Sequence, residues 1–218
     1  ANLGPPNSPR TGVISDALYK FIEDFSDNKK TKYKCIEDFL KNNYPDIKSL
    51  KSGEAIIDYS KDIIDESINA VKKLNSSFLL IQGPPGAGKT YTSAKIILSL
   101  IKDKKKVGIN SNSHKAINNL LLKIEELAAE EDFKFEGFKK SSKEVDKFNG
   151  KNIRESRIEL VTKNCLIYAG TAWLFSDARL DQKLDYVFID EAGQVSLANS
   201  IAIATTTKNI VLIGDQMQ

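Results

Sequence analysis

Gly83-Pro84-Pro85-Gly86-Ala87-Gly88-Lys89-Thr90 matches the phosphate-binding loop pattern G-x-x-x-x-G-K-[ST]. The apolar run Phe78 to Ile81 precedes this loop, and a helix-like stretch from Tyr91 to Ile101 follows it. This order suits phosphate binding, because a buried strand delivers the chain to a glycine-rich turn whose backbone N–H groups point at the start of a helix. Lys89 is expected to reach the β- and γ-phosphates of a nucleotide, and the Thr90 hydroxyl to ligate Mg²⁺.

Two adjacent acids end a second apolar run. Tyr186 to Ile189 is typical of a buried parallel strand, and Asp190 and Glu191 follow at its carboxyl end, where open α/β sheets place ligands. Asp190 is suited to hold Mg²⁺ through its water shell, and Glu191 to orient and deprotonate the attacking water. A GTPase positions this water with a Gln, and a small-molecule kinase needs no hydrolytic base. The acid pair therefore favours an ATPase.

Apolar runs and helical patterns alternate along most of the chain, which predicts an α/β fold with a parallel sheet and right-handed crossovers. The expected strands are Phe78 to Ile81, Val107 to Ile109, Leu166 to Tyr168, Val187 to Ile189 and Ile210 to Ile213. The expected helices are Ser15 to Phe25, Lys34 to Asn43, Gly53 to Leu74, Thr90 to Lys102, Lys115 to Glu130 and Ser196 to Ala204. We expect an N-terminal lead-in and helical segment over residues 1–75, with a flexible start at Ala1 to Pro9, and a nucleotide-binding domain over residues 76–218.

The composition excludes few functions. With 41% hydrophobic residues, 218 residues are enough for one well-buried α/β domain. A net charge of +3 is only weakly basic, so nucleic-acid binding has to be argued from the placement of residues. Cys35 and Cys165 lack C-x-x-C spacing, and no stretch is typical of a signal peptide or a membrane span. We expect no membrane association, a reducing, cytoplasmic compartment, and Cys165 as a core strand residue.

Three motifs resemble those of superfamily 1 helicases. Asp190 to Gln194 is similar to their D-E-A-x-Q motif II, Gly214 to Gln218 to motif III, and Asn110 to Leu120 to motif Ia. The branch they resemble contains the nonsense-mediated-decay RNA helicase and the eukaryotic replication nuclease-helicase. Ile81 to Gly86 and Ser111 to Lys115 resemble, more narrowly, microbial helicases that carry a RecB-type nuclease module. The resemblance covers residues 76 to 218 and implies the first RecA-like domain of such a helicase.

On the nucleotide side, the resemblance implies roles for three further residues. Gln218 matches the glutamine that senses the γ-phosphate, and Gln194 matches the one that links nucleotide state to the bound strand. The resemblance also implies that Asp215 supports the end of the sheet and the attacking water near Glu191. The family normally has a glutamine upstream of the phosphate loop for adenine recognition, but residues 1–81 contain none. Specificity for adenine is therefore open.

The resemblance also implies contacts to a single strand of nucleic acid, with DNA favoured over RNA. Ser113 matches the motif Ia position that contacts a strand phosphate, and His114 beside it is either a second strand contact or a loop or cap residue. Thr171, in Gly170-Thr171-Ala172, either touches a second phosphate or caps a strand end. His114 is the only histidine and has no metal-ligand spacing around it. Trp173 and Phe175 are expected in the core.

An insertion at about 131–163 separates the motif Ia helix from the next strand. Its segment Phe133 to Lys163 mixes basic and acidic residues with phenylalanines. One interpretation is a small subdomain over the nucleic-acid channel, whose basic residues and aromatics form a backbone-tracking groove. The other is a solvated helical hairpin whose phenylalanines make a minor core.

These patterns predict a motor domain that uses ATP and Mg²⁺ to alter its grip on single-stranded nucleic acid. Helicases of this family close the ATP site with arginines from a second RecA-like domain of the same parent chain. An arginine finger contributes about 10³ to 10⁵ in rate, so residues 1–218 alone are expected to hydrolyse ATP poorly. The resemblance also allows for a fused nuclease module. The alternative is a clamp or sensor that binds ATP and a strand without translocating.

Overall fold

A computed structural model describes residues 12–27, 31–141 and 144–215 of the chain. The expected lead-in at Ala1 to Pro9 and the motif III residue Gln218 lie outside the described residues. The strands of the described part are β1 (Phe78–Gln82), β2 (Val107–Asn110), β3 (Gly137–Lys139), β4 (Ile153–Glu155), β5 (Ile167–Gly170), β6 (Leu184–Ile189) and β7 (Thr207–Gly214). The helices are α1 (Gly12–Asp27), α2 (Lys34–Leu40), α3 (Ile63–Lys72), α4 (Lys89–Lys102), α5 (His114–Glu130), α6 (Ala172–Phe175) and α7 (Leu197–Ala204).

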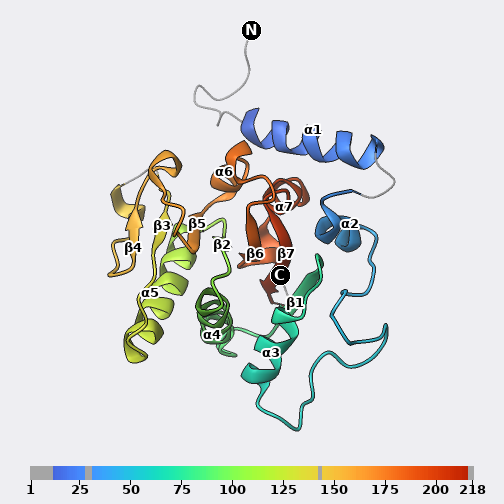
Figure 1. Cartoon of the computed structure of the whole chain (residues 1–218), viewed down its shortest axis with the longest axis horizontal. Coiled ribbons are helices and arrows are strands. Elements are labelled where there is room, and N and C mark those ends of the chain that lie inside the picture. The colour runs from blue at the N-terminus through green and yellow to red at the C-terminus, as the bar shows by residue number, and fades with distance from the viewer. Residues whose placement is uncertain (1–11, 28–30, 142–143, 216–218) are drawn as a thin grey trace.

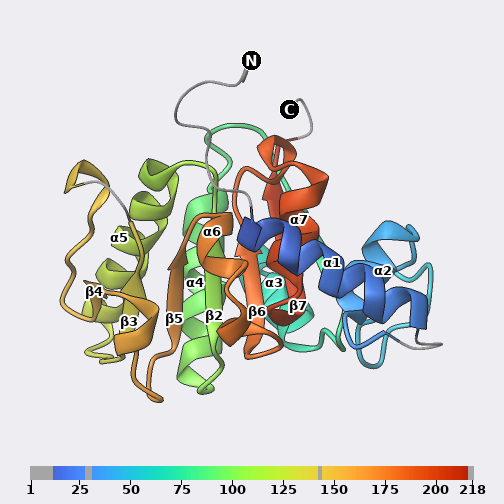
Figure 2. The ribbon, with the colours of Figure 1, turned by 90° about the horizontal axis from the view of Figure 1, so that it is seen from above.

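In the described part of the chain, the strands form one seven-stranded sheet with the order β1-β7-β6-β2-β5-β3-β4, and every pair is parallel. Figure 2 shows this order from β4 and β3 at one side to β7 at the other. Since all strands run the same way, their carboxyl ends share one edge of the sheet. The loops that leave β1, β6, β2 and β5 therefore meet along that edge.

Helices cover both faces of the sheet. Helices α1, α6 and α7 lie on one face, and α3, α4 and α5 lie on the other (Figure 1). The alternation of side chains along β6 shows how one strand serves both cores: Tyr186 and Phe188 join the α3–α5 side, whereas Val187 and Ile189 join the α1–α7 side. This arrangement confirms the predicted α/β fold.

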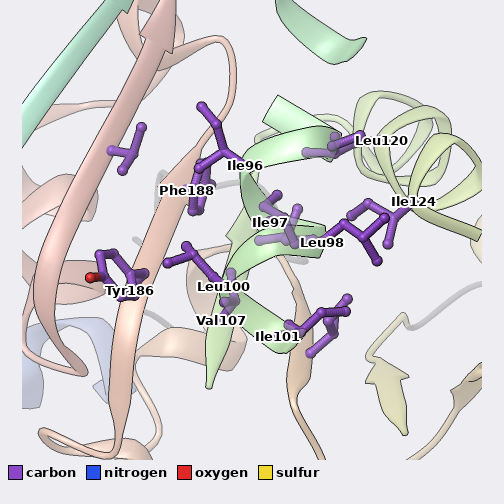
Figure 3. Close-up of a cluster of buried hydrophobic side chains, with 14 of the residues drawn as sticks. Ile96, Ile97, Leu98, Leu100, Ile101, Val107, Leu120, Ile124, Tyr186 and Phe188 are labelled. Carbon is purple, nitrogen blue, oxygen red and sulfur yellow. The ribbon is translucent and has the colours of Figure 1, made fainter. Parts of the chain in front are cut away.

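Helix α4, which follows the phosphate loop, is held by apolar packing. Figure 3 shows its residues Ile97 and Leu98 between Phe188 of β6 and Ile124 of α5. Ile97 and Ile124 are fully buried. Complete burial of an aliphatic side chain contributes about 1.5–3 kcal/mol. The loop at the start of α4 is therefore carried by one of the most firmly packed helices of the molecule.

The N-terminal helices pack on the sheet's other face. Phe21 of α1, Tyr33 and Ile36 join the same core as β6 and α7. Tyr33 donates a hydrogen bond from Oη to Asp181 Oδ1 (2.9 Å), and Lys20 pairs with the same carboxylate at 2.6 Å. Ion pairs near the surface contribute about 0–1 kcal/mol, so the buried side chains hold these helices in place more than the charges do.

The two cysteines are both buried and free. Cys165 lies in the core but two residues before β5, so the prediction of a core residue is confirmed while its place within a strand is wrong. Burial raises the pKa of the Cys35 and Cys165 thiols to about 12. A buried thiol with a raised pKa is unreactive, which gives both residues a packing role.

The helix expected over Gly53 to Leu74 is shorter than predicted. Helix α3 begins only at Ile63, because Asp62 caps it by accepting hydrogen bonds from Ile64 N (2.9 Å) and Asp65 N (3.0 Å). Asp58 before it binds Ser60 through both the backbone N–H and the hydroxyl, which stabilises a turn. Local side-chain hydrogen bonds therefore override the helical spacing of the isoleucines upstream.

The insertion adds strands rather than a helical hairpin. Its residues supply β3 and β4 at the edge of the sheet, and the carboxylate of Glu125 on α5 anchors them by accepting hydrogen bonds from Asn152 N and Ile153 N, both at 2.9 Å. Phe133, Phe135 and Phe148 pack against the core on the α3–α5 side. The predicted helical hairpin is wrong, although its phenylalanines do pack against a core. Phe135 also lines a hollow with Lys151 and Arg154 of the insertion. Among the described residues, no helix has the length and apolar character needed to cross a membrane.

Candidate nucleotide and nucleic-acid site

The phosphate loop joins β1 to α4 at the carboxyl edge. Gly86 and Gly88 both have a φ of +79°, a left-handed conformation that glycine adopts without strain. A Cβ added at either glycine would meet nothing within 4 Å, so the loop surrounds open space. Lys89 Nζ donates hydrogen bonds to the carbonyl oxygens of Gly83 and, at 3.0 Å, of Pro84. The lysine thus folds over its own loop, in position to reach a phosphate held there.

Asp190 and Glu191 lie at the end of β6, two strands from the loop. The Asp190 carboxylate accepts a hydrogen bond from Glu191 N at 3.0 Å. Burial raises the pKa of Asp190, the Glu191 carboxylate adds to this rise, and the Lys89 ammonium acts in the opposite direction. Since β1, β7 and β6 are parallel neighbours, the phosphate loop and the acid pair leave the sheet at the same edge, separated by one strand.

Glu191 has an unusual backbone conformation. Its φ of +53° lies in the left-handed region, where a residue with a Cβ is strained. This conformation ends β6 and begins the short 3-10 helix Ala192–Gln194. Strain of this kind persists where the surrounding structure fixes it, and it concentrates at functional sites.

The residues present fit a nucleotide bound with Mg²⁺. Thr90 is exposed in the first turn of α4. Asp190 is half-buried at the end of β6, which lies two strands from β1 in the sheet. Across the described residues, no group of three or more His, Cys, Asp or Glu gathers in a way that would hold a metal alone. Mg²⁺ commonly uses one or two side chains together with the phosphates of a nucleotide, so a hydroxyl and one carboxylate are a sufficient protein contribution.

The other residues implied on the nucleotide side lie around the same edge. Asp215 directly follows β7 and is half-buried, and the backbone N–H of Gly83 donates to Gly214 O at 3.3 Å. The phosphate loop and the Asp215 loop therefore leave the sheet side by side. Gln194 is exposed at the end of the 3-10 helix after β6.

The loop after β2 connects the acid pair after β6 to the residues expected to contact a strand of nucleic acid. Ser111 is fully buried, and its hydroxyl donates to Glu191 Oε2 at 3.3 Å while accepting from Ser113 N at 3.3 Å. Asn112 Nδ2 donates to the carbonyl oxygen of Gln194 at 2.6 Å. Two hydrogen-bonded links therefore tie the loop after β2 to the loop after β6.

The three residues expected to contact a strand of nucleic acid lie next along the carboxyl edge of the sheet. Ser113 caps α5 by accepting a hydrogen bond from Ala116 N at 3.3 Å, and His114, half-buried, is the first residue of that helix. Thr171 occupies the cap position of α6 after β5, but its side chain accepts no hydrogen bond from that helix. β2 and β5 pair directly, with Asn110 opposite Gly170, so the candidates belong to adjacent strand ends.

The sequence motifs found the charged residues of the site and missed several polar ones. Ser111 and Asn112 lie within the stretch that resembles motif Ia, but no role was predicted for them. Their place just after β2 marks them as residues of the carboxyl edge, whereas their partners Glu191 and Gln194 are far away in the sequence. Phe175 is fully buried, as expected. Trp173 is not a core residue: it is half-buried and faces a hollow next to Thr171.

Comparison with known proteins gives a consistent result. A sequence model of the AAA domain family matches residues 67–218. The chain is 27% identical to ATP-dependent helicase NAM7 of Saccharomyces cerevisiae over 98% of its own length, but spans only 27% of that protein. It is 26% identical to the DNA replication ATP-dependent helicase/nuclease dna2 of Schizosaccharomyces pombe over 75% of its length, and spans 12% of it. These matches confirm the expected relationship to superfamily 1 helicases.

A solved structure shares the fold. The UvsW helicase from Bacteriophage T4 matches 82% of this chain, and the match covers 68% of that protein's chain, with a TM-score of 0.50 and 12% sequence identity. At this identity the likeness concerns the fold alone. It agrees with the predicted RecA-like parallel sheet flanked by helices.

Proposed function

The chain belongs to the AAA domain family, and we propose that it is the first motor domain of an ATP-driven helicase or translocase that moves on single-stranded nucleic acid. One observation carries this proposal. Ser111 and Asn112, in the loop that presents Ser113 to a strand, donate hydrogen bonds to Glu191 and to the Gln194 carbonyl, in the loop that carries the acid pair.

On the nucleotide side, the phosphates of ATP lie in the loop at the start of α4. The backbone N–H groups and the Lys89 ammonium offset their charge, and the exposed Thr90 hydroxyl and the Asp190 carboxylate would hold Mg²⁺. When bound, Mg²⁺ neutralises charge on the transferring phosphoryl group. Glu191 accepts a proton from the attacking water, and Ser111 holds the carboxylate in place for this role.

On the strand side, Ser113 and Thr171 contact successive phosphates at the ends of β2 and β5. Contacts to the backbone position a strand without reading its bases, so binding depends little on sequence. The hydrolysis state reaches Ser113 through the hydrogen bonds of Ser111, and the Asn112 bond to the Gln194 carbonyl adds a second link between the two loops. Gln194, Asp215 and Gln218 stay predicted coupling and sensing residues.

Several finer expectations stay predictions. They include DNA rather than RNA as the preferred strand, a cytoplasmic location, the second RecA-like domain that supplies arginines, and a fused nuclease module. The domain division at residue 75 is also a proposal. Its two sides are packed together, because Phe21 of α1 and Ile36 of α2 share one core with Val187 of β6.

ATP turnover with and without single-stranded DNA or RNA tests the proposal, in a form of the protein long enough to include the predicted second domain. We expect a strand to raise turnover many-fold. Glu191→Gln should lower turnover by about 10²- to 10⁴-fold while nucleotide binding persists, because only the general base is lost. Glu130→Gln, at an exposed position at the end of α5, is the matched control. Unchanged turnover with intact ATP binding would instead support a clamp that does not translocate.

A further inference from the structure

A small hollow lies next to the residues expected to contact a strand of nucleic acid. It has a volume of about 110 Å³ and lies beyond Thr171, on the side away from the phosphate loop. Its walls come from the start of α5, the end of β3 and the turn into α6, and are formed by His114, Lys140, Ser141, Thr171, Trp173 and Leu174. Cationic, hydroxyl and aromatic groups therefore surround one hollow at the carboxyl edge.

The insertion brings part of this hollow into place. β3 pairs with β5, with Lys139 opposite Ala169, and the backbone N–H of Lys140 donates to Ala169 O at 2.8 Å. The order β2-β5-β3 thus places Lys140 one strand beyond Thr171, and Thr171 one strand beyond Ser113. A strand of nucleic acid that lies on Ser113 and Thr171 reaches the hollow next.

Trp173 is the aromatic wall of the hollow. On the short helix α6, its neighbours Ala172, Leu174 and Phe175 are all buried, whereas Trp173 is half-buried. The helix is therefore seated in the core by its other residues, while part of the indole stays exposed. A fixed, partly open aromatic ring stacks on bases of any kind, because every base has a π-face.

The charges around the hollow allow a polyanion to approach. Lys140 is partly exposed at its rim. Two acids of the neighbouring segments have partners: Glu155 Oε1 accepts hydrogen bonds from Ser141 N (2.6 Å) and Ser141 Oγ (2.8 Å), and Asp177 pairs with Arg179 at 2.5 Å. The buried Lys139 donates a hydrogen bond from Nζ to the carbonyl oxygen of Asp146.

We propose that the hollow is a base-stacking subsite for single-stranded nucleic acid, in which Trp173 stacks on a base and Lys140 contacts the phosphate beyond the one at Thr171. This inference rests on the proposed function, since it takes Ser113 and Thr171 as the neighbouring contacts. It assigns the insertion a role as an extension of the strand path. It also makes the grip tolerant of sequence, because stacking selects no particular base.

Trp173 is the only tryptophan of the chain, so its fluorescence reports on this hollow alone. A single-stranded oligonucleotide with an end label is titrated into the 218-residue chain, with label anisotropy and tryptophan emission followed together. We expect the emission to be quenched and both signals to saturate at the same concentration. Trp173→Leu should weaken binding about tenfold, and Trp173→Phe much less, because phenylalanine still stacks.

The salt dependence of oligonucleotide affinity tests the role of Lys140 separately. Lys140→Ala should lower the slope of log affinity against log salt by about 0.7, the value for one phosphate of a single strand. Lys183→Ala removes the same charge from an exposed lysine at the start of β6, on the opposite edge, and should leave the slope unchanged.

Two results would overturn the inference, and they are distinguishable. If the oligonucleotide binds and Thr171→Ala weakens it, but the emission stays constant and Trp173→Phe and Trp173→Leu bind like wild type, the stacking subsite is wrong and the proposed function stands. If no oligonucleotide binds while nucleotide does, both fail. The quenching is measured in the wild-type chain, so a misfolded leucine variant does not prevent the decision.

Discussion

Compared with the half of the carboxyl edge formed by β1, β7 and β6, the half formed by β2, β5 and β3 has a different chemistry. The first presents Lys89, Asp190 and Glu191 around a glycine loop. The second presents the hydroxyls of Ser113 and Thr171, with Lys140 at its far end. Transfer of a phosphoryl group needs fixed charges at the reacting atoms, whereas a motor must release its strand repeatedly and is better served by weaker, neutral contacts.

The loops after β2 and β6 join the two halves by hydrogen bonds. Ser111 donates to Glu191 and accepts from Ser113 N, so one buried hydroxyl touches both chemistries. The comparison therefore predicts that some substitutions affect one half alone, and that Ser111 affects the communication between them.

Among the effects on binding affinity, the largest is expected at Lys89. Lys89→Ala should weaken nucleotide binding about 10- to 100-fold, because a charge-assisted hydrogen bond to phosphate contributes about 1.5–3 kcal/mol. Strand binding without nucleotide should change less than about twofold. Titration of a fluorescent ATP analogue and of a labelled oligonucleotide measures the two affinities.

A matched control for this variant is Lys105→Ala, an exposed lysine just beyond the far end of α4. It should change neither affinity. A parallel loss of strand binding in Lys89→Ala, with an unchanged melting temperature, would show that the two halves are not separate.

A smaller effect is expected at Ser111. Ser111→Ala should reduce the stimulation of ATP turnover by a strand about fivefold, because it removes one hydrogen bond to the Glu191 carboxylate and one from the Ser113 amide. Affinities for nucleotide and strand, measured separately, should stay within about twofold of wild type.

Ser77→Ala is the control for Ser111→Ala, since Ser77 is also fully buried but bonds to Asp46 N at the opposite end of β1. It should lower stability without altering stimulation. Equal stimulation in Ser111→Ala and wild type would mean that the halves communicate by another route.

The smallest effect concerns stability. Because burial raises the pKa of Asp190, its ionised form is disfavoured in the folded state, and this cost is present at pH values above that pKa. Asp190→Asn should therefore raise the free energy of unfolding at neutral pH by about 1 kcal/mol or less, and the gain should disappear as the pH falls and the wild-type carboxyl is protonated. Urea unfolding at neutral and acidic pH measures it. A gain that grows toward acidic pH would contradict this account.

The central sheet was predictable because its strands are continuous apolar runs bounded by motifs. Val107 to Ile109 and Ile210 to Ile213 fall within observed strands for this reason. β3 and β4 were missed, because strands of three residues that contain Lys139, Arg154 and Glu155 give no apolar signal. Their place in the sheet depends on pairing with β5 and on the Glu125 anchor, which are tertiary contacts.

The site was predictable where a motif combines residues close in sequence. Lys89 with Thr90, and Asp190 with Glu191, are such pairs. Ser111 was not predictable from its motif, because its partner Glu191 lies 80 residues away. Trp173 was assigned to the core from its residue type, but its exposure depends on how α6 is seated against β5 and α7.

The most direct test of the account is the linkage between the two halves. The affinity for a fluorescent ATP analogue with Mg²⁺ is measured in the absence and in the presence of a saturating single-stranded oligonucleotide. The affinity for the oligonucleotide is measured in the absence and in the presence of saturating nucleotide. Coupling between sites typically changes affinity about 5- to 150-fold, and the two changes must be equal. The account predicts such a change in the wild-type chain and a smaller one in Ser111→Ala. Affinities that are the same in all four conditions would contradict it.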